Sequence, residues 1–291
     1  DGRKWLTNVL WDHRPEKSLN HNRPAKFFSG IILQEYDPIG KALTGPIKKI
    51  FSGSHLGLVE GSHLYKHNGY YYLLTAEGGT FAHHASLFAR SKTIEGPYEV
   101  DPKGHFLAAA TDLAAPLRRT GHGDWVVTED GQNYFVHLCG RPLEYRGRSV
   151  MGRETAIQKL QWSDDGWLRL VNGGQAGDLI VDAPSADTLQ VNSVIDQHIA
   201  FNNQQLPIDF QSPREALSPQ HLSYTARPGY LRLCGQEAPL TLFSQSLIAR
   251  RQQALTFSAQ TSIDFQPNSF QQMAGLISYY NTKKFRTKTI Y

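Results

Sequence analysis

The 291-residue sequence has little cysteine, no long apolar run and no excess of one charge. Its two cysteines, Cys139 and Cys234, lie far apart, so we expect separate buried thiols in a reducing compartment, and hence a cytoplasmic protein. No apolar stretch approaches the roughly 20 residues that span a bilayer, so we expect no membrane association. Because acidic and basic residues are interleaved and the net charge is only +4, no basic stripe indicates nucleic acid.

Several chemical signatures are also missing. The sequence contains no nucleophile elbow around a serine, no glycine loop for phosphate and no dinucleotide fingerprint, so hydride and phosphoryl transfer lack their binding parts. No spaced set of Cys and His residues indicates zinc, and we expect no required cofactor. No segment carries a sustained helical period, which favours an all-β fold.

What the first part of the chain does contain is a repeated turn followed by aromatic residues. The four units lie at residues 1–6, 68–72, 130–135 and 165–168. The first three turns are 67 and 62 residues apart, and each is followed by an alternating segment, at 30–36, 85–90 and 154–160. Short strands that recur at a long period predict a β-propeller with one four-stranded blade per repeat.

The repeat ends in a linker of small residues with one proline, Pro184, around residues 173–187. We therefore expect a propeller domain over residues 1–183 and a second domain over residues 184–291. Alternating runs at 255–259 and 261–265 are predicted as strands of an antiparallel sandwich in this second domain.

The repeat brings two candidate site residues into register. Glu60 stands eight residues before the turn at Asn68, and His122 stands eight before the turn at Asp130. Both are predicted to begin equivalent strands of successive blades and, if those strands are innermost, to approach one axis. Glycoside hydrolysis needs a protonated carboxyl and a second carboxylate, so Glu60 is a candidate acid. An exposed carboxylate at a strand end is the alternative for Glu60.

Three histidines are candidate metal ligands. His122 lies between glycines that leave room for a ligand or a close backbone approach, but a metal would need more ligands than this one. A buried, hydrogen-bonded histidine is the alternative. Residues 77–80, which begin with Glu77, and the pair His83-His84 after them are expected in a loop at the top of a blade, with the two histidines solvated.

Arg153 is a candidate for binding the substrate. A fixed arginine can bind sugar hydroxyls or pair with Glu60, and its charge would favour the ionised form of a nearby carboxylate. A salt bridge between Arg153 and Glu154, or another acid, is the alternative.

The sequence resembles glycoside hydrolase family 43, in its β-xylosidase branch. The first region carries the resemblance in residues 60–66 and 71–80, which read EGSHLYK and YYLLTAEGGT, and in segments 8–14, 89–91, 95–100, 137–142 and 152–158. Segments 227–233, 245–252 and 270–276 resemble the C-terminal β-sandwich of that branch. The resemblance covers nearly the whole chain.

The resemblance implies a partial five-bladed β-propeller followed by a partial antiparallel β-sandwich of the concanavalin-like jelly-roll type. It implies an inverting enzyme, a homo-oligomer at full length, that releases xylose from the non-reducing ends of xylo-oligosaccharides or arabinoxylan-derived substrates. Glu60 matches the general acid and Arg153 the arginine that contacts the terminal sugar. His122 matches a histidine beneath the pocket, linked in some relatives to a calcium ion, and Phe270 an aromatic residue that helps wall the pocket.

The resemblance also implies that some catalytic parts lie outside this chain. Family members use a general-base Asp, an Asp that tunes the pKa of the acid, and the acid Glu, and both Asp residues belong upstream of Asp1. We therefore expect a fragment without its base and without about two blades, which alone would be inactive on an aryl xyloside and prone to association. Two alternatives are an arabinofuranosidase or arabinan-directed family member, and a degenerate propeller that binds sugar without cleaving it.

Overall fold

The computed structural model describes residues 2–11, 28–143, 147–182, 197–202 and 205–290, and every regular element in them is a β-strand. No helix in these residues is long and apolar enough to cross a membrane. The chain divides into two compact units, Asp1–Leu189 and Gln190–Tyr291, which we treat separately. The predicted boundary at 183/184 falls outside the described residues and stays a prediction, as do the turn at Asp1 and segment 12–14.

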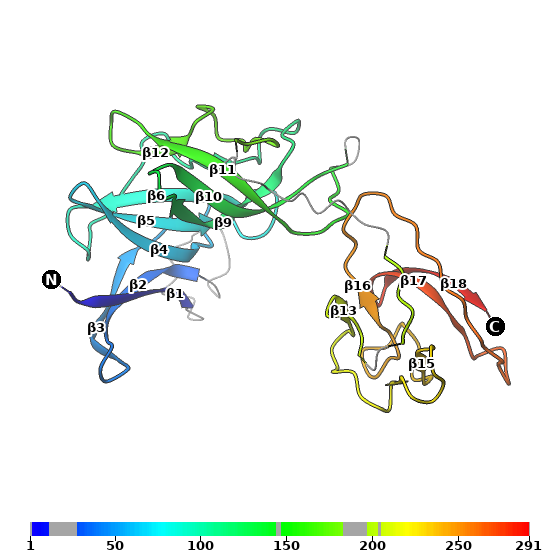
Figure 1. The fold of residues 1–291 in the computed structure, drawn as a ribbon. Helices are drawn as coiled ribbons and strands as arrows, with labels where there is room; N and C mark the ends of the chain where they lie inside the picture. Colours follow the sequence, from blue (N-terminus) through cyan, green and yellow to red (C-terminus); the bar gives the residue numbers. More distant parts are fainter. Residues whose placement is uncertain (1, 12–27, 144–146, 183–196, 203–204, 291) are drawn as a thin grey trace. The chain divides into compact units, whose positions relative to one another are not determined.

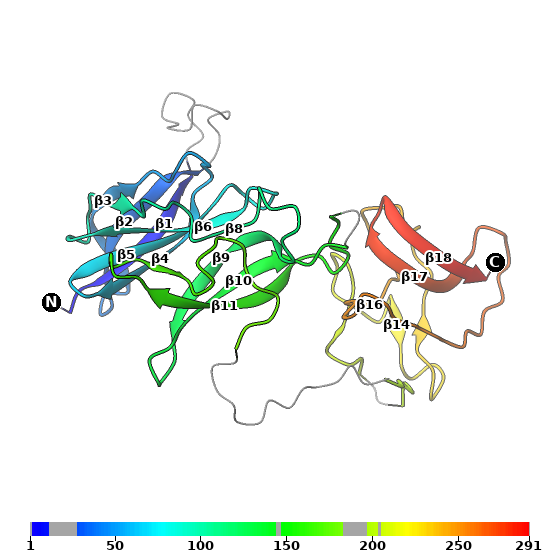
Figure 2. The ribbon, with the colours of Figure 1, turned by 90° about the horizontal axis from the view of Figure 1, so that it is seen from above.

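Three antiparallel sheets follow one another in the first unit (Figures 1 and 2). The first sheet has the order β1 (Lys4–Trp11), β2 (Phe28–Asp37), β3 (Ala42–Phe51). The second has the order β4 (Glu60–His67), β5 (Tyr70–Glu77), β6 (Ala85–Ser91), β7 (Glu99–Val100), and β8 (Leu107–Ala108) also pairs with β6. The third has the order β12 (Leu168–Leu170), β11 (Glu154–Trp162), β10 (Asn133–Gly140), β9 (Arg118–Val127). These sheets correspond to the blades that the repeat predicts, but in the described residues only the third has the expected four strands, whereas the first has three and the second five.

The predicted turns stand between the strands as expected. Asn68 and Gly69 join β4 to β5 with φ of +45° and +76°, values that most residues avoid. Gly131 (φ +82°) lies between β9 and β10, and Gly166 (φ +78°) between β11 and β12. The fourth unit of the repeat therefore forms the outer hairpin of the third blade.

Two buried clusters fill the spaces between the sheets. β5 contributes to both, because successive side chains of a strand point to opposite faces. Leu73 packs with side chains of the first sheet, whereas Tyr72 and Leu74 pack with side chains of the third. The first cluster is Ile31, Leu33, Ile50, Phe51, Val59, Leu73, Leu87 and Ala89. The second is Tyr72, Leu74, Phe88, Phe106, Leu107, Trp125, Phe135, Leu160, Trp167, Leu168 and Leu170.

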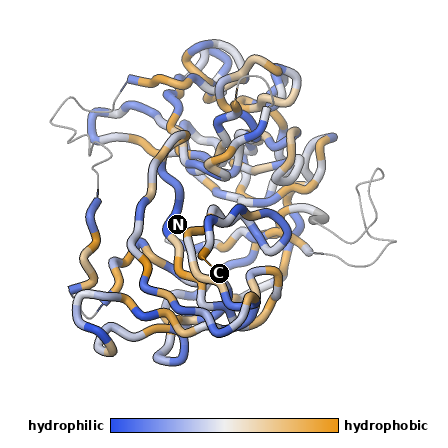
Figure 3. Tube along the Cα trace, turned by 90° about the vertical axis from the view of Figure 1, so that its right-hand side faces the viewer, coloured by the Kyte–Doolittle hydropathy of each residue, from blue (hydrophilic) through white to orange (hydrophobic). Residues whose placement is uncertain are grey.

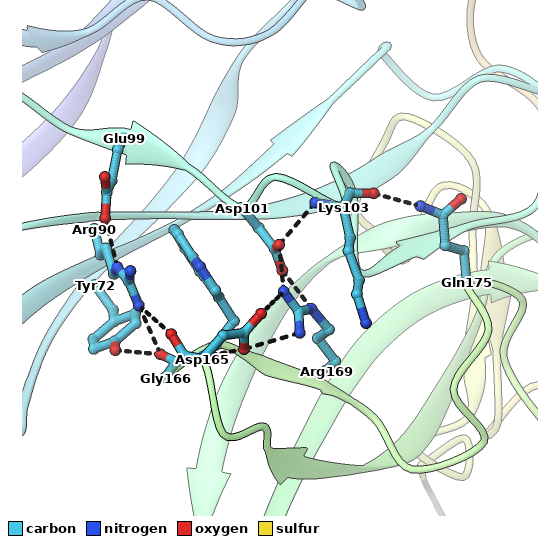
Figure 4. Close-up of polar contacts among 10 residues, drawn as sticks. Tyr72, Arg90, Glu99, Asp101, Lys103, Asp165, Gly166, Arg169 and Gln175 are labelled. Atoms are coloured by element: carbon cyan, nitrogen blue, oxygen red, sulfur yellow. Dashed lines mark hydrogen bonds and ion pairs between the residues drawn. The ribbon is translucent and has the colours of Figure 1, made fainter.

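Charged side chains form ion pairs and hydrogen bonds between the outer parts of the second and third blades (Figure 4). The Arg169 guanidinium on β12 contacts Asp101 at 2.6 Å and Asp165 at 2.8 Å. Arg90 on β6 donates to the carbonyl oxygens of Asp165 (2.9 Å) and Gly166 (3.2 Å). Asp101 is 3% exposed, so these contacts replace the water that its carboxylate loses on burial.

The second unit contains short antiparallel pairs. These are β13 (Phe210–Gln211) with β16 (Ala249–Arg250), β14 (Leu222–Ser223) with β15 (Arg232–Leu233), and β17 (Ala274–Asn281) with β18 (Lys284–Ile290).

The strands predicted at 255–259 and 261–265 are wrong, because these residues pair with no described strand. Leu255 and Phe257 are 49% and 58% exposed. Hydrophobic and hydrophilic residues alternate at short intervals through much of the chain (Figure 3), so alternation alone does not show that a segment has a hydrogen-bonded neighbour.

Candidate active site

Glu60 and His122 meet between the second and third blades. Glu60 is the first residue of β4, His122 lies on β9, and these two edge strands contact one another. Glu60 Oε1 lies 3.8 Å from His122 Nδ1. The predicted approach of the two side chains from neighbouring blades is therefore confirmed. The Glu60 and His122 side chains are 22% and 43% exposed, so both can reach a solvent-borne ligand, and the alternative of a buried His122 is wrong.

The position of His122 along its strand differs from the prediction. His122 is the fifth residue of β9 and does not begin it. The register passes from Gly123, opposite His137, to Gly121, opposite Leu138, so His122 is the extra residue of a bulge and has a φ of +53°. A bulge re-aims a side chain, and the β4–β5 register is also irregular just after Glu60.

Gly61 allows the close approach of the two strands. A Cβ atom on Gly61 would lie 2.8 Å from His122 Nε2, and the φ of Gly61 is +58°. The glycines beside His122 are predicted to leave room for a ligand or for a close backbone approach. Gly123 confirms the second possibility, since a Cβ there would lie 2.1 Å from the carbonyl oxygen of Val136.

Arg153 lies near the pair and does not bind the acid next to it in sequence. Its Nη2 is 3.3 Å from Nδ1 of His84, and burial lowers its pKa while the charge of Glu60 acts to raise it. Glu154 binds Arg141 instead, with an Nη2–Oε1 distance of 2.8 Å. The alternative salt bridge between Arg153 and Glu154 is therefore wrong.

His84 is buried, which contradicts the solvated loop predicted for His83-His84. It is 1% exposed, immediately precedes β6, and places Nδ1 at 3.1 Å from the carbonyl oxygen of Arg119. Burial lowers the pKa of His84 to about 4, so its imidazole is neutral at neutral pH. His83, its neighbour, is exposed as predicted.

Glu77 lies on a strand, which contradicts the loop predicted for residues 77–80. It ends β5 and its side chain is fully buried, in contact with Ser54 and His105. The signal that could have found it is its position at the end of a strand, Tyr70–Glu77, whose preceding residues are aromatic or apolar apart from Thr75.

Phe270 and the calcium ion remain predictions. Phe270 belongs to the second unit and is 83% exposed. Calcium takes 6–8 oxygen ligands, and in the described part of the chain no three His, Cys, Asp or Glu side chains are grouped as a metal site. The calcium ion at His122 therefore stays a prediction, and no catalytic step below depends on a metal.

Comparison with known proteins identifies the class. The family model described as "Glycosyl hydrolases family 43" matches residues 1–168, and the chain belongs to this family. A second model, "Beta xylosidase C-terminal Concanavalin A-like domain", matches residues 198–289. Family-43 neighbours are five-bladed propellers, so the predicted all-β class, with a propeller followed by a concanavalin-like domain, is confirmed.

Individual relatives agree with this class. Xylosidase/arabinosidase 43B of Humicola insolens is 48% identical over 282 residues, which cover 96% of this chain and 50% of that protein. The β-xylosidase of Bacillus subtilis (strain 168) is 43% identical over 293 residues, covering 98% and 53%. The crystal structure of xylan β-1,4-xylosidase from Bacillus halodurans C-125 has a TM-score of 0.81 at 43% identity, covering 98% and 52%. The chain thus spans about half the length of the curated relatives it matches.

Proposed function

We propose that the protein containing this chain is an exo-acting glycosidase that releases xylose from the non-reducing ends of β-1,4-xylo-oligosaccharides with inversion, and that Glu60 is its general acid. The observation that supports this best is the position of Glu60 at the head of β4, partly exposed and 3.8 Å from His122 of the next blade. The geometry supports an acid at this point, and the names of the relatives support the sugar.

The roles of the neighbours follow from their charge and reach. Protonated Glu60 donates to the oxygen of the leaving sugar as the glycosidic bond breaks. The Arg153 cation stabilises the carboxylate that Glu60 then becomes and can bind hydroxyls of the terminal sugar. His122 contacts Glu60 from the other blade and limits the directions in which the carboxyl group can turn.

In this proposal, the carboxylate that activates water is not part of residues 1–291. An inverting reaction needs a base about 6.5–9.5 Å from the acid, with water between them. We propose that the base belongs to the part of the relatives' length that residues 1–291 do not span. Residues 1–291 alone should then lose about 10²–10⁴ in rate from this absence.

Arabinofuranoside hydrolysis is a second candidate. The relative from Humicola insolens is named a xylosidase/arabinosidase, and a relative from Bacteroides ovatus, 32% identical over 264 residues, is named a non-reducing end α-L-arabinofuranosidase. The two sugars present similar pentose hydroxyls. Comparing kcat/KM of the full-length protein for aryl β-xyloside and aryl α-arabinofuranoside separates the two substrates.

The acid role is tested by the dependence on the leaving group. In the full-length protein, Glu60→Gln should lower kcat/KM for xylobiose by about 10²–10⁴ and affect 2,4-dinitrophenyl β-xyloside much less, because that leaving group needs little protonation. Glu95→Gln, at an exposed glutamate paired with Lys48, is the control. Equal loss on both substrates contradicts the proposal.

Two further readouts complete this test. Proton NMR should show α-xylose as the first product if the reaction inverts. Calorimetric binding of xylobiose without any turnover by the full-length protein would instead support the sugar-binding alternative and overturn the enzyme proposal.

A further inference from the structure

We propose that Glu77, Ser54 and His105 form a clamp that positions Glu60 by holding the segment before it, residues 52–59. This inference rests on the proposed role of Glu60 as the acid. The three clamp residues come from separate segments in or next to the second blade. Ser54 lies in the connection from β3 to β4, Glu77 ends β5, and His105 lies in the connection from β7 to β8. None of them is among the residues given a chemical role above, which are Glu60, His122 and Arg153.

The centre of the clamp is a fully buried carboxylate. Glu77 Oε1 accepts a hydrogen bond from the backbone N–H of Ser54 at 2.8 Å. Glu77 Oε2 accepts one from the Ser54 hydroxyl and lies 2.9 Å from His105 Nε2. The Glu77 side chain is 0% exposed and that of His105 10% exposed. A buried carboxylate without partners is very unfavourable, so these contacts hold Ser54 and His105 to one place.

The segment that the clamp holds has an unusual backbone. Gly53, Gly57 and Leu58 all have positive φ, of +81°, +64° and +52°. Leu58 lacks the conformational freedom of glycine, because a residue with a Cβ atom pays roughly 1–2 kcal/mol to adopt a positive φ. Such a conformation persists only where the surroundings impose it. Leu58 stands two residues before Glu60, so whatever imposes this backbone also sets the start of β4.

Further hydrogen bonds connect the clamp to the strained residues. The Leu56 N–H donates to the Ser54 hydroxyl at 3.2 Å, and the Gly78 N–H, next to Glu77, donates to the carbonyl oxygen of Gly57 at 2.8 Å. The segment is therefore fixed at Ser54 and at Gly57, on both sides of its bend. A proton donor must be aligned closely with the oxygen it protonates, and a displacement of about 1 Å can cost about 10²-fold in rate.

The same three residue types can form a nucleophilic triad, but the geometry here is different. In a triad the histidine uses one ring nitrogen for the serine and the other for the carboxylate. Here Ser54 Oγ (3.4 Å) and Glu77 Oε2 (2.9 Å) approach the same nitrogen, Nε2 of His105. The Ser54 hydroxyl also donates directly to Glu77. This arrangement fixes positions and does not activate the serine.

The first test measures backbone hydrogen exchange in residues 1–291 and needs no activity. Ser54→Ala removes the acceptor of the Leu56 N–H, and Glu77→Gln replaces one of the two accepting carboxylate oxygens by an NH2 group that cannot accept. Each variant should therefore speed exchange in the peptide covering residues 52–60 by about tenfold. The control is Ser91→Ala. Ser91 is a buried serine of the same blade, and its hydroxyl accepts the N–H of Thr93 at 3.1 Å. It lies at the opposite end of β6 from Ala85, the residue paired with Glu77. Unchanged exchange at 52–60 overturns the clamp.

The second test separates the clamp from the acid itself, in the full-length protein. Ser54→Ala should lower kcat for xylobiose by about 10–100-fold, with KM nearly unchanged and with little effect on 2,4-dinitrophenyl β-xyloside, whereas Ser91→Ala should change neither. If Glu60→Gln shows this leaving-group dependence and Ser54→Ala does not, the clamp is overturned while the function stands. If Glu60→Gln does not show it, the proposed function fails, and faster exchange at 52–60 still supports the clamp.

Discussion

The contact between Glu60 and His122 depends on a residue that has no side chain. Gly61 follows the acid directly, and the His122 ring occupies the space where a Cβ atom of residue 61 would lie. The position of the His122 ring beside the acid therefore depends on the lack of a Cβ atom at position 61 as well as on the bulge in β9.

Gly61→Ala tests this arrangement, and Gly69→Ala is its control. Both glycines have positive φ, of +58° and +76°, but a Cβ on Gly69 would meet no atom within 4 Å. Both variants should lose about 1 kcal/mol of unfolding free energy for the backbone strain, measured by denaturant titration. Only Gly61→Ala should also displace His122 and lower kcat/KM of the full-length protein, by about tenfold or more. Equal activity of the two variants would contradict this role of Gly61.

The burial of two histidines should make the free energy of unfolding depend on pH. Burial lowers the pKa of His84 and of His137 to about 4 from an ordinary value of 6.5. Between these values the unfolded chain binds more protons than the folded one, so this contribution to stability is complete above pH 6.5 and is lost as pH falls towards 4.

Thermal unfolding at pH 7.5 and 4.5 measures this effect. The drop in melting temperature between the two pH values should be smaller in His84→Gln than in the unsubstituted chain, by about 5 °C. His83→Gln, at the exposed neighbouring histidine, should keep the full drop. An identical drop in all three proteins would show that His84 titrates normally.

At the scale of elements, the propeller depends on contacts between blades as well as within them. The strands β12 and β6 carry the arginines that bridge the second and third blades, and Asp101 raises the pKa of Arg169 through a direct hydrogen bond. The blades that present Glu60 and His122 are the same two blades, so this outer bridge helps to keep the inner edge strands in place.

Asp101→Ala tests the bridge. It leaves the largely buried Arg169 with Asp165 as its remaining acidic partner, and should destabilise the first unit by about 3 kcal/mol in denaturant titration. Glu95→Ala removes the exposed partner of Lys48 and should change stability by less than about 1 kcal/mol. Similar small effects for both would mean that the bridge between the blades contributes little.

The features predicted correctly from sequence are those that neighbouring residues determine. The turns at Asn68, Gly131 and Gly166 follow from local backbone preferences, and the approach of Glu60 to His122 follows from counting back along equivalent strands. The bulge at His122, the burial of His84 and that of Glu77 depend on which strand lies opposite, and a single sequence does not show this. The unpaired residues 255–265 were mispredicted for the same reason.

At the scale of the molecule, the two units differ in how much they bury. The first unit contains both large hydrophobic clusters. Among the described residues of the second unit, Leu222 is the only hydrophobic side chain that is buried to a comparable degree. Since burial of apolar surface is the main favourable contribution to folding, the second unit should be the less stable one.

Each unit contains one free cysteine, which allows this difference to be measured. Cys139 is buried in the first unit and Cys234 is half-buried in the second. In increasing denaturant, thiol labelling should reach Cys234 at a lower concentration than Cys139. The variants Cys139→Ser and Cys234→Ser assign the two signals. Labelling of both thiols in a single transition would show that the units unfold together.

The backbone at Leu58 connects the stability of the first unit with the proposed activity. Leu58→Gly would relieve the positive φ and should raise the unfolding free energy by up to about 1 kcal/mol, but the segment before Glu60 would gain conformational freedom. Denaturant titration and turnover of the full-length protein should therefore change in opposite directions. A selection for heat resistance would favour this substitution, and a selection for xylose release would remove it.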